Sequence, residues 1–279
     1  MAWGSLYSGG FLFGPVQMAP FRYEFQRRGY PAWSCGTSIG VFHAAMFARG
    51  EPGAARCEQE WRGIDELSDV QRLNADFWRG FYSLNPARTM LIKHRAGRDM
   101  NHPVYAGMVD VATQEHELER LDRWHHNAII ASASQPLLHE VTKYKGRYKM
   151  DGGAAMVLPP APPNWWRSVD EVVAVFCSPI TNRARIRTQA ECNSALEYLQ
   201  VYLEMAITRT VQDDFRRLLE MSHRAPVTVY APDSWEQIGR NNDASHAALV
   251  NRLDVVGPWM AEHPMRLEGG KVVEGERPA

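Results

Sequence analysis

Short apolar runs alternate along this chain with amphipathic stretches, and the alternation predicts strands and helices in turn. Residues 2–7 read as a first strand, and a helix is expected over residues 14–28, where a proline falls in the first turn. A second strand is expected over residues 31–35. It leads directly into a helix that is apolar nearly all round, over residues 39–50, as a buried central helix would be.

The later part of the chain continues this pattern. Residues 51–102 read as helical and irregular, and the chain from Met265 onward, rich in glycine and charge, reads as a frayed tail. Further strands are expected within 104–119, 125–131, 146–150, 171–177 and 227–230, and further helices over 191–221 and 245–256. Strands that alternate with helices predict an α/β fold with a largely parallel sheet, whose active site lies at the carboxyl ends of strands.

The composition is that of an ordinary globular protein. The chain has 279 residues, of which 45% are hydrophobic, so it is long enough to bury a sizeable core. A net charge of −1 gives no basic excess for nucleic acid. No apolar run approaches the roughly 18 residues that cross a bilayer, and the N-terminus lacks the basic stretch of a signal peptide.

The four cysteines are widely spaced and form no C-x-x-C pair, which argues against a zinc ribbon or a redox motif. Cys35 and Cys177 lie in apolar runs and are interpreted as buried free thiols. We therefore expect a protein of the reducing cytoplasm.

The most informative motif is Gly36-Thr37-Ser38-Ile39-Gly40, a G-x-S-x-G element between a predicted strand and a predicted helix. In that context it is a candidate nucleophile elbow, a sharp turn that lifts a serine hydroxyl into a cleft. Side chains at Gly36 and Gly40 would crowd the turn, and glycine has no Cβ to clash. Ser38 is therefore the candidate nucleophile.

Two other glycine turns follow predicted strands. Ser8-Gly9-Gly10 precedes a helix, so its backbone N–H groups could bind a developing oxyanion; its glycines do not match the dinucleotide pattern G-x-G-x-x-G. Asp151-Gly152-Gly153 offers a carboxylate, and its two glycines would let the backbone approach the serine. By itself Asp-Gly-Gly is a common structural turn. Its interpretation as a catalytic motif becomes stronger because the other two motifs occur in the same chain.

A histidine base is the alternative, since the chain has ten histidines. The α/β-hydrolase order of serine, acid and histidine would need a late one, and His223, His246 and His263 do not lie in distinctive loops. The pair His125-His126 lacks the spacing of a metal motif. His223, His246 and His263 are interpreted as surface or packing residues.

Taken together, these motifs resemble the patatin-like phospholipase family over nearly the whole chain, from about Ala2 to about Trp259. The family pattern is a glycine-rich loop, a G-x-S-x-G elbow and a D-G-G or D-G-A motif, in that order. Two more stretches, VDVATQEHELE and ASASQPLLHEV, resemble family segments that precede the aspartate.

The resemblance implies a three-layer α/β/α fold and a Ser–Asp dyad without a catalytic histidine. Ser38 would attack an ester carbonyl, Asp151 would take its proton, and water would hydrolyse the acyl-enzyme. The backbone of Gly9, Gly10 and Phe11 would form the oxyanion hole. No cofactor or metal is implied.

The expected organisation is one acyl hydrolase domain over residues 1–264, with a helical cap-like insertion at about 51–102, and a flexible tail over 265–279. The insertion carries an aromatic cluster, which is either core packing or the lining of an acyl-chain pocket: Trp61, Phe77, Trp78, Phe81 and Tyr82. The expected partners are a lipid or acyl ester and, transiently, a membrane surface.

One departure from the family bears on function. The family's loop reads G-G-G-x-[R/K]-G, whereas this chain has Gly9-Gly10-Phe11-Leu12-Phe13-Gly14 and so lacks the third glycine and the basic residue. Three functions stay open: a phospholipase A-type enzyme or lysophospholipase, a serine esterase or thioesterase on small acyl substrates, and a catalytically weak binding or regulatory module.

Overall fold

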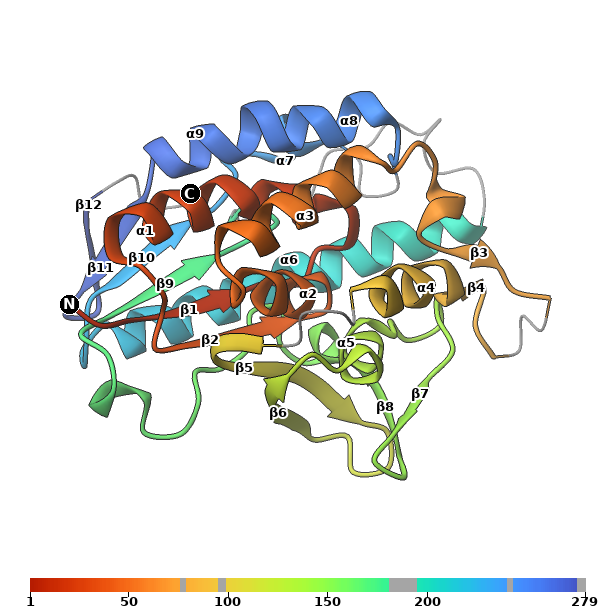
Figure 1. Cartoon of the computed structure of the whole chain (residues 1–279), viewed down its shortest axis with the longest axis horizontal. Helices are drawn as coiled ribbons and strands as arrows, with labels where there is room; N and C mark the ends of the chain where they lie inside the picture. The colour runs from red at the N-terminus through yellow and green to blue at the C-terminus, as the bar shows by residue number, and fades with distance from the viewer. Residues whose placement is uncertain (76–78, 95–98, 181–194, 240–242, 275–279) are drawn as a thin grey trace.

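A ten-stranded mixed sheet runs through the molecule (Figure 1). The structure is a computed structural model that describes residues 1–75, 79–94, 99–180, 195–239 and 243–274. The strands lie in the order β12-β11-β10-β9-β1-β2-β5-β8-β7, and β6 pairs with β5. Their bounds are β1 Trp3–Tyr7, β2 Trp33–Thr37, β5 Asp99–Asp110, β6 His116–Arg123, β7 Thr142–Tyr144, β8 Arg147–Asp151, β9 Glu171–Val175, β10 Val227–Tyr230, β11 Met265–Glu268 and β12 Lys271–Glu274.

The centre of the sheet is parallel, as the alternating pattern predicts. Strands β10, β9, β1, β2 and β5 run in one direction, and antiparallel strands are added at both ends. The five residues of β9, EVVAV, are all buried. Such near-continuous apolar strands are typical of parallel sheets covered on both faces.

Helices cover the two faces and make three layers (Figure 1). In β9, Val173 and Val175 belong to one core, and Val172 and Ala174 to the other, because successive side chains point to opposite faces. The first core is covered by α1 Met18–Arg28, α2 Ile39–Phe47, α3 Glu51–Arg62, α5 His126–Ala133 and α9 Gly257–Glu262. The second is covered mainly by α6 Ala195–Met221.

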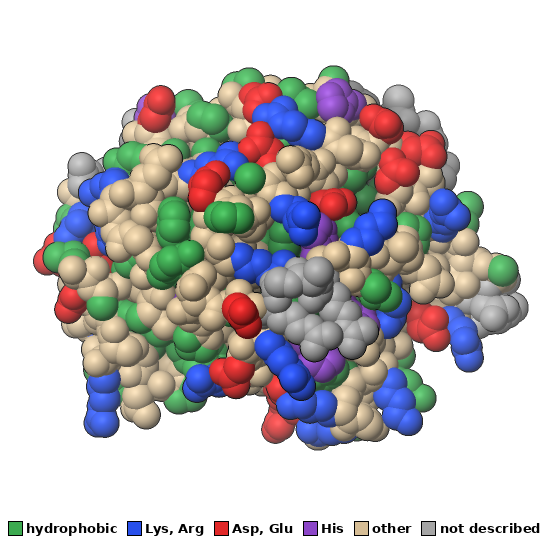
Figure 2. Space-filling view, viewed as in Figure 1, with side chains coloured by type: hydrophobic (Ala, Val, Ile, Leu, Met, Phe, Trp, Pro, Cys, Tyr) green, Lys and Arg blue, Asp and Glu red, His purple; other side chains and the backbone are tan. Residues whose placement is uncertain are grey.

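Shorter elements complete the described part of the chain. The segment at 51–102, called the cap segment below, contains α3, η2 Leu67–Asp69, β3 Arg72–Leu73, β4 Tyr82–Ser83 and α4 Asn85–Lys93. The expected helix over 245–256 is α8 His246–Asn251 followed by the π-helical turn η7 Arg252–Val256, which runs on into α9. Figure 2 shows acidic and basic side chains interspersed over one face, in keeping with the near-zero net charge.

The structure corrects two expectations. Residues 126–133 form the helix α5 where a strand was predicted, because a short apolar run does not distinguish a buried helix from a buried strand. The chain from Met265 forms a hairpin, β11 and β12, that adds to β10, and Leu267 is fully buried. The expected tail was therefore wrong for residues 265–274, and residues 275–279 lie outside the described part.

The sheet brings two predicted motifs together. Along one edge of β5, Gly107 pairs with Thr37 at the end of β2, and the next residue, Met108, pairs with Asp151 at the end of β8. Strand β6 occupies the other edge of β5. Because β2 is parallel and β8 antiparallel to β5, their carboxyl ends meet head to head. Residues 36–40 and 151–153 therefore become neighbours.

Candidate active site

Ser38 occupies a strained turn between β2 and α2. Its backbone has φ 55° and ψ −124°, a conformation that side-chain-bearing residues rarely adopt and that is found mostly at functional sites. A Cβ on Gly36 would lie 2.3 Å from the backbone of Gly40, and one on Gly40 would lie 2.3 Å from the carbonyl oxygen of Tyr7. The turn therefore requires both glycines, as predicted, and has the strand–turn–helix form of a nucleophile elbow.

A buried serine from α5 holds this turn in place. The Ser38 N–H donates to Oγ of Ser132 at 2.9 Å, and the Ser132 hydroxyl donates to the Gly107 carbonyl at 2.6 Å. Ser132 thus links the elbow to β5. The sequence gives no signal for this role of Ser132, because both of its hydrogen-bond partners are distant in sequence.

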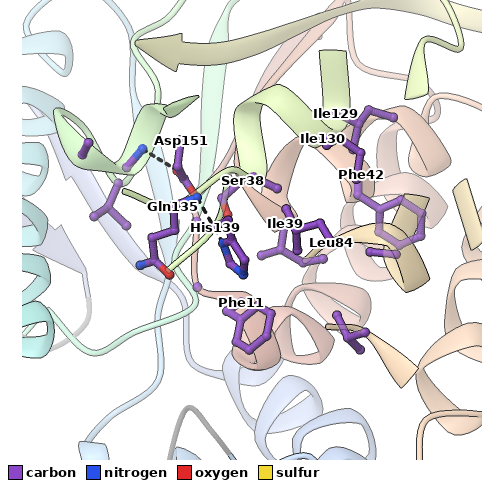
Figure 3. Close-up of a pocket in the computed structure, with 18 of the residues that line it drawn as sticks. Phe11, Ser38, Ile39, Phe42, Leu84, Ile129, Ile130, Gln135, His139 and Asp151 are labelled. Carbon is purple, nitrogen blue, oxygen red and sulfur yellow. Dashed lines mark hydrogen bonds between the residues drawn. The ribbon is translucent and has the colours of Figure 1, made fainter. Parts of the chain in front are cut away.

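Asp151 is the last residue of β8 and lies beside the elbow (Figure 3). Its N–H donates to the Ser134 carbonyl at 2.8 Å, and its carboxylate accepts the Gly153 N–H at 2.7 Å. Burial raises the pKa of Asp151 to about 6, while hydrogen bonds from the Ser38 side chain and the Gly153 N–H act to lower it. The structure thus joins the predicted serine and aspartate.

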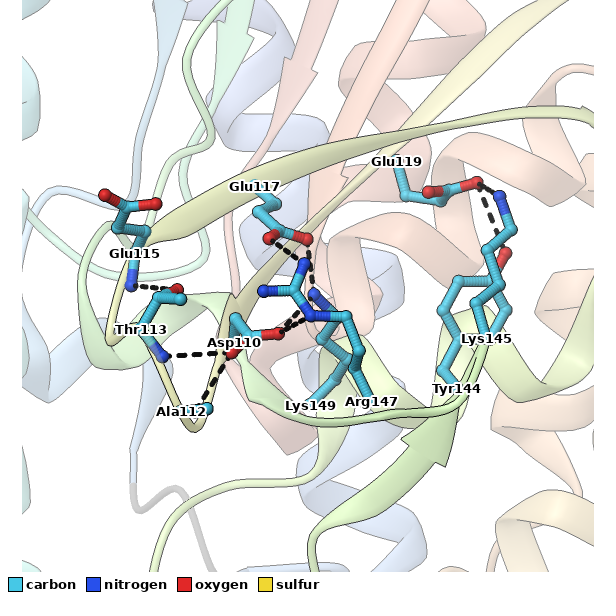
Figure 4. A network of polar contacts seen from close by, with 10 residues as sticks. All are labelled: Asp110, Ala112, Thr113, Glu115, Glu117, Glu119, Tyr144, Lys145, Arg147 and Lys149. Atoms are coloured by element: carbon cyan, nitrogen blue, oxygen red, sulfur yellow. Dashed lines mark hydrogen bonds and ion pairs between the residues drawn. The ribbon is translucent and has the colours of Figure 1, made fainter.

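An ion-pair network that is buried at Asp110 and Lys149 lies close to Asp151 in β8 (Figure 4). Asp110, at the end of β5, pairs with Lys149 at 2.9 Å and with Arg147 at 2.8 Å, and Lys149 also pairs with Glu117 of β6. Asp110 and Lys149 are direct cross-strand partners. Because this pair would be broken by a slip of one residue, the network specifies the register of β8 and hence the position of Asp151.

His43, behind the elbow in α2, cannot act as the base. Its Nε2 accepts from the Trp61 indole N–H at 2.9 Å, and its Nδ1 therefore carries the proton and donates to Gln17 at 2.7 Å. Burial lowers the pKa of His43 to about 3. Both ring nitrogens are occupied, so no lone pair is left for the Ser38 proton.

The remaining histidine candidates are placed elsewhere. Within the described chain, His223, His246 and His263 are not among the residues that line the cavity containing Ser38. His125 and His126 stand at the start of α5, and no cluster of potential metal ligands occurs among the described residues.

The glycine loop after β1 packs directly against the elbow. A Cβ on Gly9 would lie 3.2 Å from Cβ of Ser38. The Gly9 N–H, however, donates to the Val157 carbonyl at 2.8 Å. Gly9 thus shapes the loop, but its N–H is already committed to a backbone bond. Phe11 begins the 3-10 helix η1 Phe11–Gln17 with a positive φ of 48°.

A cation from the far end of the chain packs against this loop. Arg252 of η7 is buried; its Nη1 donates to the Leu12 carbonyl at 3.0 Å, and its guanidinium lies 5.0 Å from the centre of the Phe13 ring. Burial lowers the pKa of Arg252 to about 10, so the side chain stays charged at neutral pH. The loop lacks a basic residue of its own but contacts one in space.

A cavity of about 370 Å³ extends from Ser38 and Asp151. Most of its walls are apolar and come from α2, the cap segment and α5; they include Phe42, Trp61, Ile64, Leu84, Met90 and Ile130. Of the predicted aromatic cluster, Trp61 lines the cavity, Phe81 is exposed, and Phe77 and Trp78 lie outside the described residues. The site is thus polar at one end and apolar along its length (Figure 3).

Cys35 and Cys177 are buried free thiols, as predicted, and Cys57 is a third; Cys192 lies outside the described residues. Among the helices described, none combines the length and hydropathy needed to cross a bilayer.

Comparison with known proteins adds little to this picture. No protein-family model and no curated protein sequence matches the chain. Among solved structures, VipD from Legionella pneumophila is similar over 96% of this chain and 68% of that chain, with 12% sequence identity and a TM-score of 0.46. A similarity this low indicates nothing about activity.

Proposed function

We propose that this protein is a serine carboxylic ester hydrolase that cleaves lipid acyl esters through Ser38 and Asp151. The observation that carries the proposal is one juxtaposition. A serine in a strained elbow faces a buried carboxylate with a raised pKa, at the polar end of an apolar cavity. A serine hydroxyl is a weak nucleophile at neutral pH and needs such a base.

The chemistry proceeds in two halves. As Ser38 Oγ attacks the ester carbonyl carbon, its proton passes to the Asp151 carboxylate. The tetrahedral intermediate then collapses, and Asp151 returns the proton to the departing alcohol. A water molecule next gives a proton to Asp151 and attacks the acyl-enzyme. The fatty acid leaves, and the proton returns to Ser38.

The developing oxyanion needs preorganised donors. We assign this role to the N–H groups of Gly10 and Phe11 at the start of η1 and to that of Ile39 at the start of α2. The first N–H groups of a helix have no partner within the helix, and the elbow residue after the nucleophile commonly supplies one donor. We leave Gly9 out, because its N–H is bonded to Val157.

The size and lining of the cavity favour a lipid acyl chain over a small acyl group. A mainly apolar space of about 370 Å³ would stay poorly filled by an acetyl group, whereas a long chain would bury apolar surface along its whole length. As the particular substrate we propose a phospholipid or lysophospholipid ester, met during transient contact with a membrane surface, and as the location of the enzyme we propose the cytoplasm.

The test is intact mass spectrometry after treatment with a long-chain fluorophosphonate, comparing wild type with Ser38→Ala. One adduct on wild type and none on the folded variant is the expected result. No adduct on folded wild type would overturn the proposed nucleophile and favour a binding module. An adduct on both proteins would place the reactive group elsewhere.

A further inference from the structure

A buried histidine lies where the cap segment meets the chain that leads to Asp151. His139 is buried, and its Nδ1 accepts the Gln135 N–H at 3.2 Å. The ring proton is therefore on Nε2, which donates to Oε1 of Gln71 at 2.6 Å. Burial lowers the pKa of His139 to about 4, which keeps the ring neutral near pH 7. Both nitrogens are thus occupied.

The same two segments are also joined through their backbones. In β4 and just before it, the N–H groups of Phe81 and Tyr82 donate to the carbonyls of Leu137 and Leu138, at 3.3 and 2.7 Å. Strand β4 pairs with β3, which begins directly after Gln71. The bond between Gln71 and His139 therefore lies beside a short stretch of backbone hydrogen bonds that join the same two segments.

Residues on both sides of this bond line the cavity that contains Ser38. Val70 comes from the cap segment, and Pro136 and Leu137 come from the segment before His139. The His139 ring also lines the cavity, with its centre 6.4 Å from that of Phe11 in the glycine loop (Figure 3). The bond thus joins two walls of one cavity.

We propose that Gln71 and His139 are positioning residues that hold the cap segment against residues 135–139 and so set which acyl chain lengths the cavity accepts. The inference rests on the proposed function. An ester with a long chain would contact the walls that the cap segment supplies, whereas an acetyl ester needs only the elbow and Asp151. Loss of this hydrogen bond should therefore lower kcat/KM more for long-chain esters than for short-chain ones.

Three variants separate this role from general destabilisation. Gln71→Met keeps the side-chain size but removes the acceptor, and it leaves the His139 N–H buried without a partner. His139→Asn retains an acceptor for the Gln135 N–H but is too short to reach Gln71. His139→Gln is the matched control, because its amide nitrogen can occupy the place of Nε2 and restore the bond to Gln71.

The measurement is kcat/KM for the acetyl and dodecanoyl esters of p-nitrophenol. Gln71→Met and His139→Asn should each lower the long-to-short ratio about tenfold, as expected for one buried hydrogen bond. The long-to-short ratio for His139→Gln should stay within roughly twofold of wild type. The ratio for the double variant Gln71→Met/His139→Asn should be no lower than that of either single variant, because both substitutions remove the same bond.

An unchanged ratio in Gln71→Met and His139→Asn would overturn the inference, and so would an equal loss on both esters. If Gln71→Met does not fold, the long-to-short ratios of His139→Gln and His139→Asn are compared instead. Equal ratios in these two variants would overturn the inference. A wild-type protein that hydrolyses neither ester would overturn the proposed function and this inference together, an outcome distinct from active variants with an unchanged ratio.

Discussion

At the scale of single residues, the burial of Asp151 favours its role as a general base and lowers the stability of the folded protein. An aspartate with its ordinary pKa of 3.8 is a weak base near neutral pH, and burial raises the pKa of Asp151 to about 6, closer to the range where a general base works well. The same burial disfavours the carboxylate in the folded protein relative to the unfolded chain.

The first prediction concerns the pH dependence of catalysis. Because Asp151 must be ionised to accept a proton, kcat/KM should fall as the pH falls through about 6 and should reach a plateau above it. Asp151→Asn should lower kcat by roughly a thousandfold or more with the fold intact. Near-wild-type turnover in that variant would contradict the dyad and reopen the search for a histidine.

Replacement of Asp151 by asparagine is also expected to stabilise the folded protein above neutral pH. A carboxyl group whose folded-state pKa is raised contributes stability that is fully present below its ordinary pKa of 3.8 and is lost as the pH rises through about 6. Asp151→Asn should therefore unfold less readily than wild type above about pH 7, by up to ~3 kcal/mol, and the difference should shrink in acid. Urea denaturation of both proteins across this range checks it; lower stability of the variant at high pH would contradict it.

At the scale of elements, helix α5 connects the parts of the site. Its Ser132 hydroxyl bonds the elbow and β5, and the Ser134 carbonyl just after it accepts the N–H of Asp151. One rigid element thus sets the distance between nucleophile and base.

Ser132→Ala should therefore slow catalysis. The substitution leaves the buried Ser38 N–H and Gly107 carbonyl without the shared hydroxyl, and a loosened elbow should lower kcat about ten- to a hundredfold with little change in KM. The matched control is Ser134→Ala, whose hydroxyl bonds the Ile130 carbonyl and Thr142 but not the elbow. Steady-state kinetics that show equal effects of the two variants would contradict the assignment.

At the scale of the whole molecule, the C-terminal hairpin is part of the sheet. Strand β11 pairs with β10 and buries Leu267 in the core beneath α6, although its sequence is charged and rich in glycine. Only one face of a hairpin at the edge of a sheet needs apolar residues. Leu267, with the partly buried Met265 and Val272 packed against the same core, can therefore anchor a stretch that is otherwise mostly polar.

Two substitutions in the hairpin test this. Leu267 is 0% exposed and Val273 is 55% exposed. Leu267→Ala should lower the free energy of unfolding by roughly 2–5 kcal/mol, whereas Val273→Ala should change it by less than about 0.5 kcal/mol. Chemical denaturation measures both. A negligible effect of Leu267→Ala would mean that the hairpin does not contribute to the core.

The local geometry at Ser38 was predictable because its causes lie within a few residues. The strand before Gly36, the apolar helix after Ile39 and the steric demand for two glycines are all visible in a short stretch of sequence. The strands β1, β9 and β10 were equally clear from their apolar runs. Helix α5 and the C-terminal hairpin were missed, because a short apolar run and a polar edge strand take their structure from what they pack against.

The sequence by itself therefore determined the α/β class, the elbow and the two motifs that accompany it, because local sterics and periodicity depend on neighbouring residues. The tertiary structure alone decided that the ends of β2 and β8 meet, that Ser132 holds Ser38, that Arg252 supports the glycine loop and that Gln71 reaches His139. Each of these depends on hydrogen bonds or charges between residues far apart in the chain, and no local pattern records which distant residues the sheet brings together.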